Sequence, residues 1–163
     1  MNNVIFIVLT GTGATILMDL WGVLRAPLLG SPPPNYGMLG RWIAHMAHGQ
    51  FRHQSIAKAD AMKGEKVLGW AAHYLIGMGF AAMLVGIWGE HWINNPTIGP
   101  ALTVGVGTIA APFLLMQPGM GAGIAASRTK NPGAARLQSL VTHTIFGFGL
   151  YLSGLTLNFS LSL

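Results

Sequence analysis

The sequence contains no cysteine. This absence excludes disulfide bonds, thiolate metal sites and cysteine-bound iron–sulfur clusters. Acidic residues are also scarce, with four Asp and Glu in 163 residues, and charged residues of both signs make up only 8% of the chain. Because soluble domains carry about 25% charged residues, this composition excludes an ordinary soluble protein and predicts an integral membrane protein.

In place of charge, the chain has long apolar runs. A bilayer core of ~30 Å is crossed by a helix of about 20 apolar residues, and four such runs are present. We therefore expect one domain over residues 1–163, an all-α integral membrane bundle of four spanning helices. The predicted spans are residues 4–24, 67–88, 97–116 and 139–159.

The nine Lys and Arg residues lie in only two of the connections between these runs. Six are in the first connection and three are in the third: Arg25, Arg41, Arg52, Lys58, Lys63 and Lys66, then Arg128, Lys130 and Arg136. Cytoplasmic loops collect such residues, so we expect a multi-pass protein of the bacterial inner membrane with both termini periplasmic. Because the charges are juxtamembrane, they indicate contact with the lipid bilayer and not with nucleic acid.

Prolines and glycines predict where helices end. Pro27 and the run Pro32–Pro34 should end the first helix, and Pro112 should kink the third. Pro118 and Gly119 should end that third helix.

The first connection is long, and residues 36–62 are typical of an amphipathic helical segment on the inner membrane surface. Its apolar residues recur at helical spacing: Leu39, Trp42, Ile43 and Met46. Its polar residues fall on another face: Arg41, His45 and His48. We expect Gly49 to break this helix, with a second short helix over residues 55–62. The polar face should contact headgroups or the mouth of the bundle, while Trp42 and Met46 are buried.

A short internal repeat links the two halves of the chain. His73-x3-Gly77-x-Gly79 matches His143-x3-Gly147-x-Gly149, and Leu17-Met18-Asp19 matches Leu115-Met116-Gln117. Parallel repeats place equivalent residues symmetrically about an axis along the membrane normal. Polar groups within spans usually face the bundle interior. The repeat thus predicts one layer in the cytoplasmic third of the bundle, made of Asp19, His73, Gln117 and His143.

Three interpretations of this layer stay open. It could bind or transport a small ligand, a metal ion or a proton, with Asp19 as charge partner and His73 and His143 as ligands or proton carriers. Arg41, His45 and His48 would then lie at its mouth. Alternatively, His73 and His143 are axial ligands of a b-type haem, with nearby glycines leaving room for the macrocycle. Finally, each imidazole could hydrogen-bond across helices in a structural subunit or homo-oligomer, which the glycine-rich faces favour.

Enzymatic activity is not expected, because the sequence places no nucleophile with a base and an orienting group. Four stretches resemble an uncharacterised family of small four-helix bacterial inner-membrane proteins, a domain of unknown function. They are Gly40-Arg41-Trp42-x2-His45-x3-Gly49-x-Phe51-x-His53, Gly64-Glu65-x3-Gly69-Trp70-x2-His73-Tyr74, Met116-Gln117-Pro118-x2-Gly121 and Ser139-Leu140-x2-His143-x2-Phe146-Gly147-x-Gly149-Leu150-Tyr151. The resemblance covers nearly the whole chain. It implies an inner-membrane location but no activity, cofactor or site residue.

Overall fold

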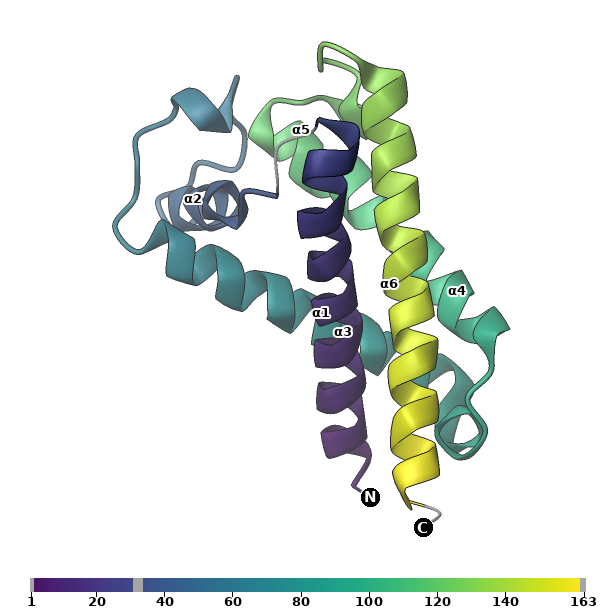
Figure 1. Cartoon of the computed structure of the whole chain (residues 1–163). Helices are drawn as coiled ribbons and strands as arrows, with labels where there is room; N and C mark the ends of the chain where they lie inside the picture. The colour runs from purple at the N-terminus through teal and green to yellow at the C-terminus, as the bar shows by residue number, and fades with distance from the viewer. Residues whose placement is uncertain (1, 31–33, 162–163) are drawn as a thin grey trace. The chain divides into compact units, whose positions relative to one another are not determined.

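The computed structural model describes residues 2–30 and 34–161, and all regular secondary structure in these ranges is helical (Figure 1). The long helices are α1 (Asn3–Leu29), α3 (Glu65–Asn94) and α6 (Pro132–Leu161). The shorter elements are α2 (Tyr36–Met46), η1 (Ile56–Lys58), α4 (Ile98–Gly107), η2 (Pro112–Met116), α5 (Gln117–Met120) and η3 (Ile124–Ala126).

Four helical segments are long and apolar enough to cross a membrane, which confirms the predicted all-α, four-span architecture. They cover Asn3–Leu28, Glu65–Asn94, Ile98–Met120 and Pro132–Ser160. Each overlaps one predicted span, and three of them extend further at both ends. The extensions occur because helical hydrogen bonding continues into polar flanking residues that a hydropathy pattern does not count.

Two of the proline predictions are wrong. Pro27 lies inside α1, which ends at Leu29 before Gly30 in a left-handed conformation. Pro118 lies inside α5, which continues to Met120 and ends at Gly121 with φ +95°. In both places the helix ends at a glycine with positive φ and not at the proline. Glycine adopts this conformation easily because it has no Cβ that would clash with the backbone. The predicted stretch at Pro32–Pro34 falls mainly outside the described residues.

The third predicted span is irregular around Pro112, where a kink was predicted, and α4 already ends at Gly107. Pro112 lacks the N–H that would continue the helical ladder, and a π-helical turn covers Pro112–Met116. Within it the N–H of Gln117 donates to the carbonyl of Pro112. The span therefore consists of α4, this turn and α5, and not of one regular helix.

The chain forms two compact units, each built from distant segments. Unit 1 comprises Met1–Pro33, Tyr74–Thr108 and Val141–Leu163, and unit 2 comprises Pro34–His73 and Ile109–Leu140. In unit 1, glycines let helices approach closely. A Cβ on Gly105 of α4 would overlap the backbone of Gly147 on α6, and one on Gly149 would lie 2.7 Å from the Cα of Ala14 on α1. Helices α1 and α6 accordingly run side by side in Figure 1.

The largest buried side chain of unit 1 is Trp92, near the end of α3. Its ring lies 6.0 Å from that of Phe6 at the start of α1. Gly154, near the end of α6, packs against the same indole: a Cβ on Gly154 would lie 2.6 Å from the nearest atom of the Trp92 ring. Trp92 also donates a hydrogen bond to the carbonyl of Thr97 in the turn before α4. The start of α1, the α3–α4 turn and the end of α6 therefore lie at one end of unit 1.

Unit 2 begins with α2, which ends at Met46. The predicted break at Gly49 is confirmed, because α2 ends at Met46 and Gly49 has φ +80°. The second short helix, predicted over residues 55–62, is reduced to the single turn η1 (Ile56–Lys58). Residues 47–64, called the connecting loop below, lead from α2 to the start of α3.

Candidate functional site

The polar side chains of unit 2 are organised by a close contact between α2 and the first turns of α3. Asn35 caps α2 by accepting a hydrogen bond from the N–H of Gly37 at 3.1 Å. A Cβ on Gly40 would overlap the carbonyl of Glu65, and one on Gly69 would overlap the carbonyl of Tyr36. Because both positions are glycine, the two backbones can touch, and the side chains beside them meet.

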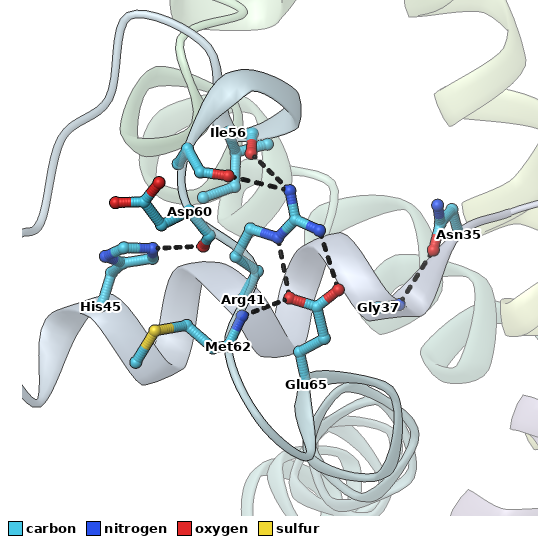
Figure 2. A network of polar contacts seen from close by, with 9 residues as sticks. Asn35, Gly37, Arg41, His45, Ile56, Asp60, Met62 and Glu65 are labelled. Atoms are coloured by element: carbon cyan, nitrogen blue, oxygen red, sulfur yellow. Dashed lines mark hydrogen bonds and ion pairs between the residues drawn. The ribbon is translucent and has the colours of Figure 1, made fainter.

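Arg41 and Glu65 form the ion pair at this contact (Figure 2). Arg41 Nε donates to Glu65 Oε2 at 2.8 Å, and Nη2 donates to Oε1 at 2.8 Å. This bidentate geometry is the one in which guanidinium and carboxylate bind most strongly. The hydrogen bonds to Glu65 raise the pKa of Arg41 above its ordinary value, so the guanidinium stays charged.

The same two side chains also hold the connecting loop. Arg41 Nη1 donates to the carbonyls of Ile56 at 3.3 Å and Ala59 at 3.1 Å. Glu65 Oε2 accepts from the N–H of Met62 at 2.9 Å. One ion pair therefore fixes the loop at three backbone positions. Figure 2 shows the contacts to Ile56, at the guanidinium, and to Met62, at the carboxylate.

His45 fixes the loop at two further points. Its Nδ1 lies 2.9 Å from Gln50 Oε1, and its Nε2 lies 3.0 Å from the carbonyl oxygen of Asp60. Only 8% of the residue is exposed. The predicted contact of Arg41 and His45 with headgroups is therefore wrong, because both side chains hydrogen-bond to carbonyl oxygens of the loop. The alternative, contact with the mouth of the bundle, stays a prediction. His48 is exposed, whereas Trp42 and Met46 are only half-buried.

A second segment of unit 2 supports the loop from the end of α5. Gly119 packs on the indole of Trp42, which donates to the carbonyl of Phe51 at 3.0 Å. The N–H of His53 donates to the carbonyl of Gly119 at 2.8 Å. A Cβ on Gly121 would overlap the carbonyl of Gln54. Residues 53 and 54 are thus held against this segment by backbone contacts.

A pocket of about 390 Å³ lies in the part of the loop that these contacts hold. Its lining residues are His53, Gln54, Ser55, Lys58 and Ala59. Ser55 precedes η1 without making a capping hydrogen bond to it. His53 Nε2 is buried without a hydrogen-bond partner among the described residues. The ring of His53 packs edge-on against that of His45, with centroids 4.9 Å apart.

The predicted layer of four polar residues is divided between the two units. Asp19 and His143 belong to unit 1, and His73 and Gln117 belong to unit 2. Among the described residues, no group of three or more His, Asp and Glu is placed to hold a metal ion. A site shared by all four residues stays a prediction.

In unit 1, Asp19 Oδ2 accepts a hydrogen bond from the hydroxyl of Tyr74 at 3.1 Å. His143 is buried, and its Nδ1 lies 3.2 Å from both the carbonyl of Gly105 and Oγ1 of Thr108. A carbonyl can only accept, so Nδ1 carries a proton in this contact. His143 thus ties α6 to α4.

In unit 2, the ring of His73 stacks on that of Tyr36, with centroids 3.9 Å apart and planes 20° apart. Tyr36 also contacts Trp70 edge-on at 4.7 Å. Gln117 is half-buried, and its Oε1 has no hydrogen-bond partner among the described residues. The repeat-related pairs therefore have different surroundings: His73 contacts an aromatic ring, whereas His143 contacts a hydroxyl and a carbonyl.

The haem interpretation required open space beside glycines near each histidine. Gly147, four residues after His143, instead contacts Ala101 and Leu102 of α4. Gly77, four residues after His73, packs on Thr15 of α1. These glycines mediate helix packing within the chain, so they leave no room there for a macrocycle and give no support for an oligomer interface on those faces.

Several residues of the pocket and its support were not predicted as site residues. No site role was predicted for Glu65, Ser55, Gln54 or Lys58. The signal that could have found the ion pair is the spacing of glycines: Gly40 precedes Arg41, and Gly69 lies one helical turn after Glu65. Small residues at such positions indicate a backbone contact that brings neighbouring side chains together.

Comparison with known proteins bears on the identity of the chain. Neither the curated proteins nor the solved structures contain a match to it. One family model, described as "Protein of unknown function (DUF2938)", matches residues 8–157. This confirms the resemblance noted from the sequence, and because the match spans most of the chain, the protein belongs to the DUF2938 family of proteins of unknown function.

Proposed function

We propose that this is a membrane-embedded binding protein whose small-molecule site is the pocket of unit 2. The observation that carries the proposal is the pocket of about 390 Å³, whose lining includes the polar residues His53, Gln54, Ser55 and Lys58. Binding pockets combine a concave surface with a few convergent polar groups.

The rigidity of the surrounding loop supports this proposal. Binding is stronger when the site is already ordered, because less conformational entropy is lost. Two side chains of α2, Arg41 and His45, hold the connecting loop at positions 50, 56, 59 and 60. The loop therefore has a fixed conformation in which η1 is the one helical turn, and binding residues are often carried on loops held by a rigid scaffold.

We further propose that the pocket opens to the cytoplasm and that both termini are periplasmic in the bacterial inner membrane. The distribution of Lys and Arg supports this orientation. A C-terminal alkaline phosphatase fusion should be active, and a C-terminal green fluorescent protein fusion should be dark. Fusions made after Gly64 are the control and should behave in the opposite way. Reversed activities at the two positions would refute the orientation.

Site-directed labelling tests the binding proposal, because the chain has no cysteine of its own. Ala59 lines the pocket, whereas Ala61 is exposed on the same loop outside the lining. With the full-length protein in an uncharged detergent, the dialysable fraction of a bacterial cell extract should slow labelling of the A59C variant by a neutral maleimide. Labelling of the A61C variant should not change. Equal rates with and without extract at both positions would contradict a small-molecule site here.

A further inference from the structure

We infer that the molecule bound in this pocket is a phosphate-bearing anion, an inference that rests on the proposed function. The pocket lining offers hydrogen-bond donors and contains no carboxylate. Lys58 supplies an ammonium group, Ser55 a hydroxyl and Gln54 an amide N–H₂, and the imidazole of His53 completes the set. Donors of this kind gathered around one space fit a ligand with several acceptor oxygens.

The pocket cation is available for such a ligand. Among the described residues, no carboxylate oxygen lies within 4.0 Å of the Lys58 ammonium. The Ser55 hydroxyl makes no capping bond to η1. Hydrogen bonds in which one partner is charged are about twice as strong as neutral ones. Lys58 would therefore contribute most to binding, and Ser55 would orient the anion through its hydroxyl.

The charge of unit 2 adds a field of the same sign. Its segments Pro34–His73 and Ile109–Leu140 carry eight Lys and Arg residues against two acidic ones, Asp60 and Glu65. Glu65 is neutralised by Arg41, which leaves Asp60 as the remaining acid. A surface of one sign raises the local concentration of ions of the other sign. This excess favours a ligand with more than one negative charge, such as a phosphate ester, over a neutral one.

A phosphate group could come from a soluble molecule or from an anionic lipid headgroup, since both present the same oxygens to the donors. The probes are inorganic phosphate, glycerol 3-phosphate and nanodiscs containing phosphatidylglycerol, with phosphatidylcholine nanodiscs and matched sodium chloride as controls. Protection of the A59C variant from a neutral maleimide is measured with each. Protection by glycerol 3-phosphate indicates a soluble source, and protection by phosphatidylglycerol alone indicates a lipid source; either result supports the inference.

Two substitutions with the same change of charge test whether the pocket itself binds the anion. K58Q removes the pocket cation, and K63Q removes an exposed cation from the same loop outside the lining. K58Q should raise the half-protecting probe concentration by about tenfold or more, and K63Q by less than about twofold. S55A, which keeps the charge, should raise it by about two- to fivefold. Because these residues are surface or half-buried positions, the variants should fold.

Three results would overturn the inference. Equal losses in K58Q and K63Q would mean that the anion responds only to diffuse charge. Protection of the A59C variant by matched sodium chloride that equals the protection by the phosphate probes would also mean that only diffuse charge acts. If the cell extract protects the A59C variant but neither phosphate compound nor phosphatidylglycerol does, the ligand is not a phosphate and the proposed binding function still holds. If the extract also gives no protection, the proposed function itself fails.

Discussion

Replacing Gly105 with leucine should unfold unit 1 or leave it strongly destabilised. A Cβ at this position would overlap the Cα of Gly147, and it would lie 2.6 Å from the nitrogen of Gly147 and 2.9 Å from the carbonyl oxygen of His143. All three are backbone atoms, which cannot move aside as the end of a flexible side chain can. Relief requires α4 and α6 to separate. Overpacking of this kind typically costs about 1–3 kcal/mol, and a leucine against backbone should lie at the upper end.

The separation would also break a polar contact. The carbonyl of Gly105 accepts a hydrogen bond from Nδ1 of buried His143. Oγ1 of Thr108 lies 3.2 Å from the same Nδ1. Moving α4 away would leave the imidazole N–H unpaired in an apolar environment, which adds about 1–3 kcal/mol for a neutral group. The overpacking and the lost hydrogen bond both lower the free energy of unfolding of unit 1.

Gly107 provides a matched control on the same helix, because nothing lies within 4 Å of where its Cβ would be. Gly107→Leu should leave stability nearly unchanged or raise it slightly, since leucine favours helix more than glycine does by about 1 kcal/mol or less. The measurement is the fraction of purified protein that stays monodisperse on size-exclusion chromatography after heating in detergent. If both leucine variants lose half of their monodisperse fraction at the same temperature, the close contact between α4 and α6 at Gly105 is contradicted.

Replacing Gly40 with valine should detach α2 from α3 and disrupt the pocket of the connecting loop while the helices of unit 1 stay folded. A Cβ at Gly40 would overlap the carbonyl of Glu65 and would lie 2.6 Å from the N–H nitrogen of Gly69. We expect a loss of about 2–3 kcal/mol from the folding of unit 2. Arg41 follows directly in the sequence, so displacement of α2 would also take the guanidinium away from Glu65 and from the carbonyls of the loop.

This variant tests whether the conformation of the connecting loop depends on the contact between α2 and α3. Without Arg41 in place the loop loses its anchors at Ile56 and Ala59, so limited proteolysis should cut within residues 47–64 much faster than in the unmodified protein. Gly133→Val is the control in the same unit, because the nearest atom to its Cβ would be 3.9 Å away. If Gly40→Val cleaves no faster than Gly133→Val, the loop does not depend on the contact between α2 and α3.

The sequence alone determined the properties that depend on composition along the chain. Long apolar runs in a chain with so few charges predict helices long enough to cross a bilayer, because the bilayer core offers no water to unpaired backbone groups. The four spans and the all-α class follow directly. So does the interruption at Pro112, which depends on the missing N–H of a single residue. The helical spacing of Leu39 and Trp42 also predicted the first helix of the amphipathic segment.

Only the tertiary structure decided which polar groups meet. From helical spacing alone, Arg41 and His45 form a face suited to headgroups; in the fold they are partly or fully buried against Glu65 and the carbonyls of the connecting loop. That choice depends on two glycines that let α2 touch α3, a contact between residues 24 or more positions apart. Hydropathy and spacing report on neighbours along one helix, whereas a hydrogen bond between distant segments depends on how closely their backbones approach.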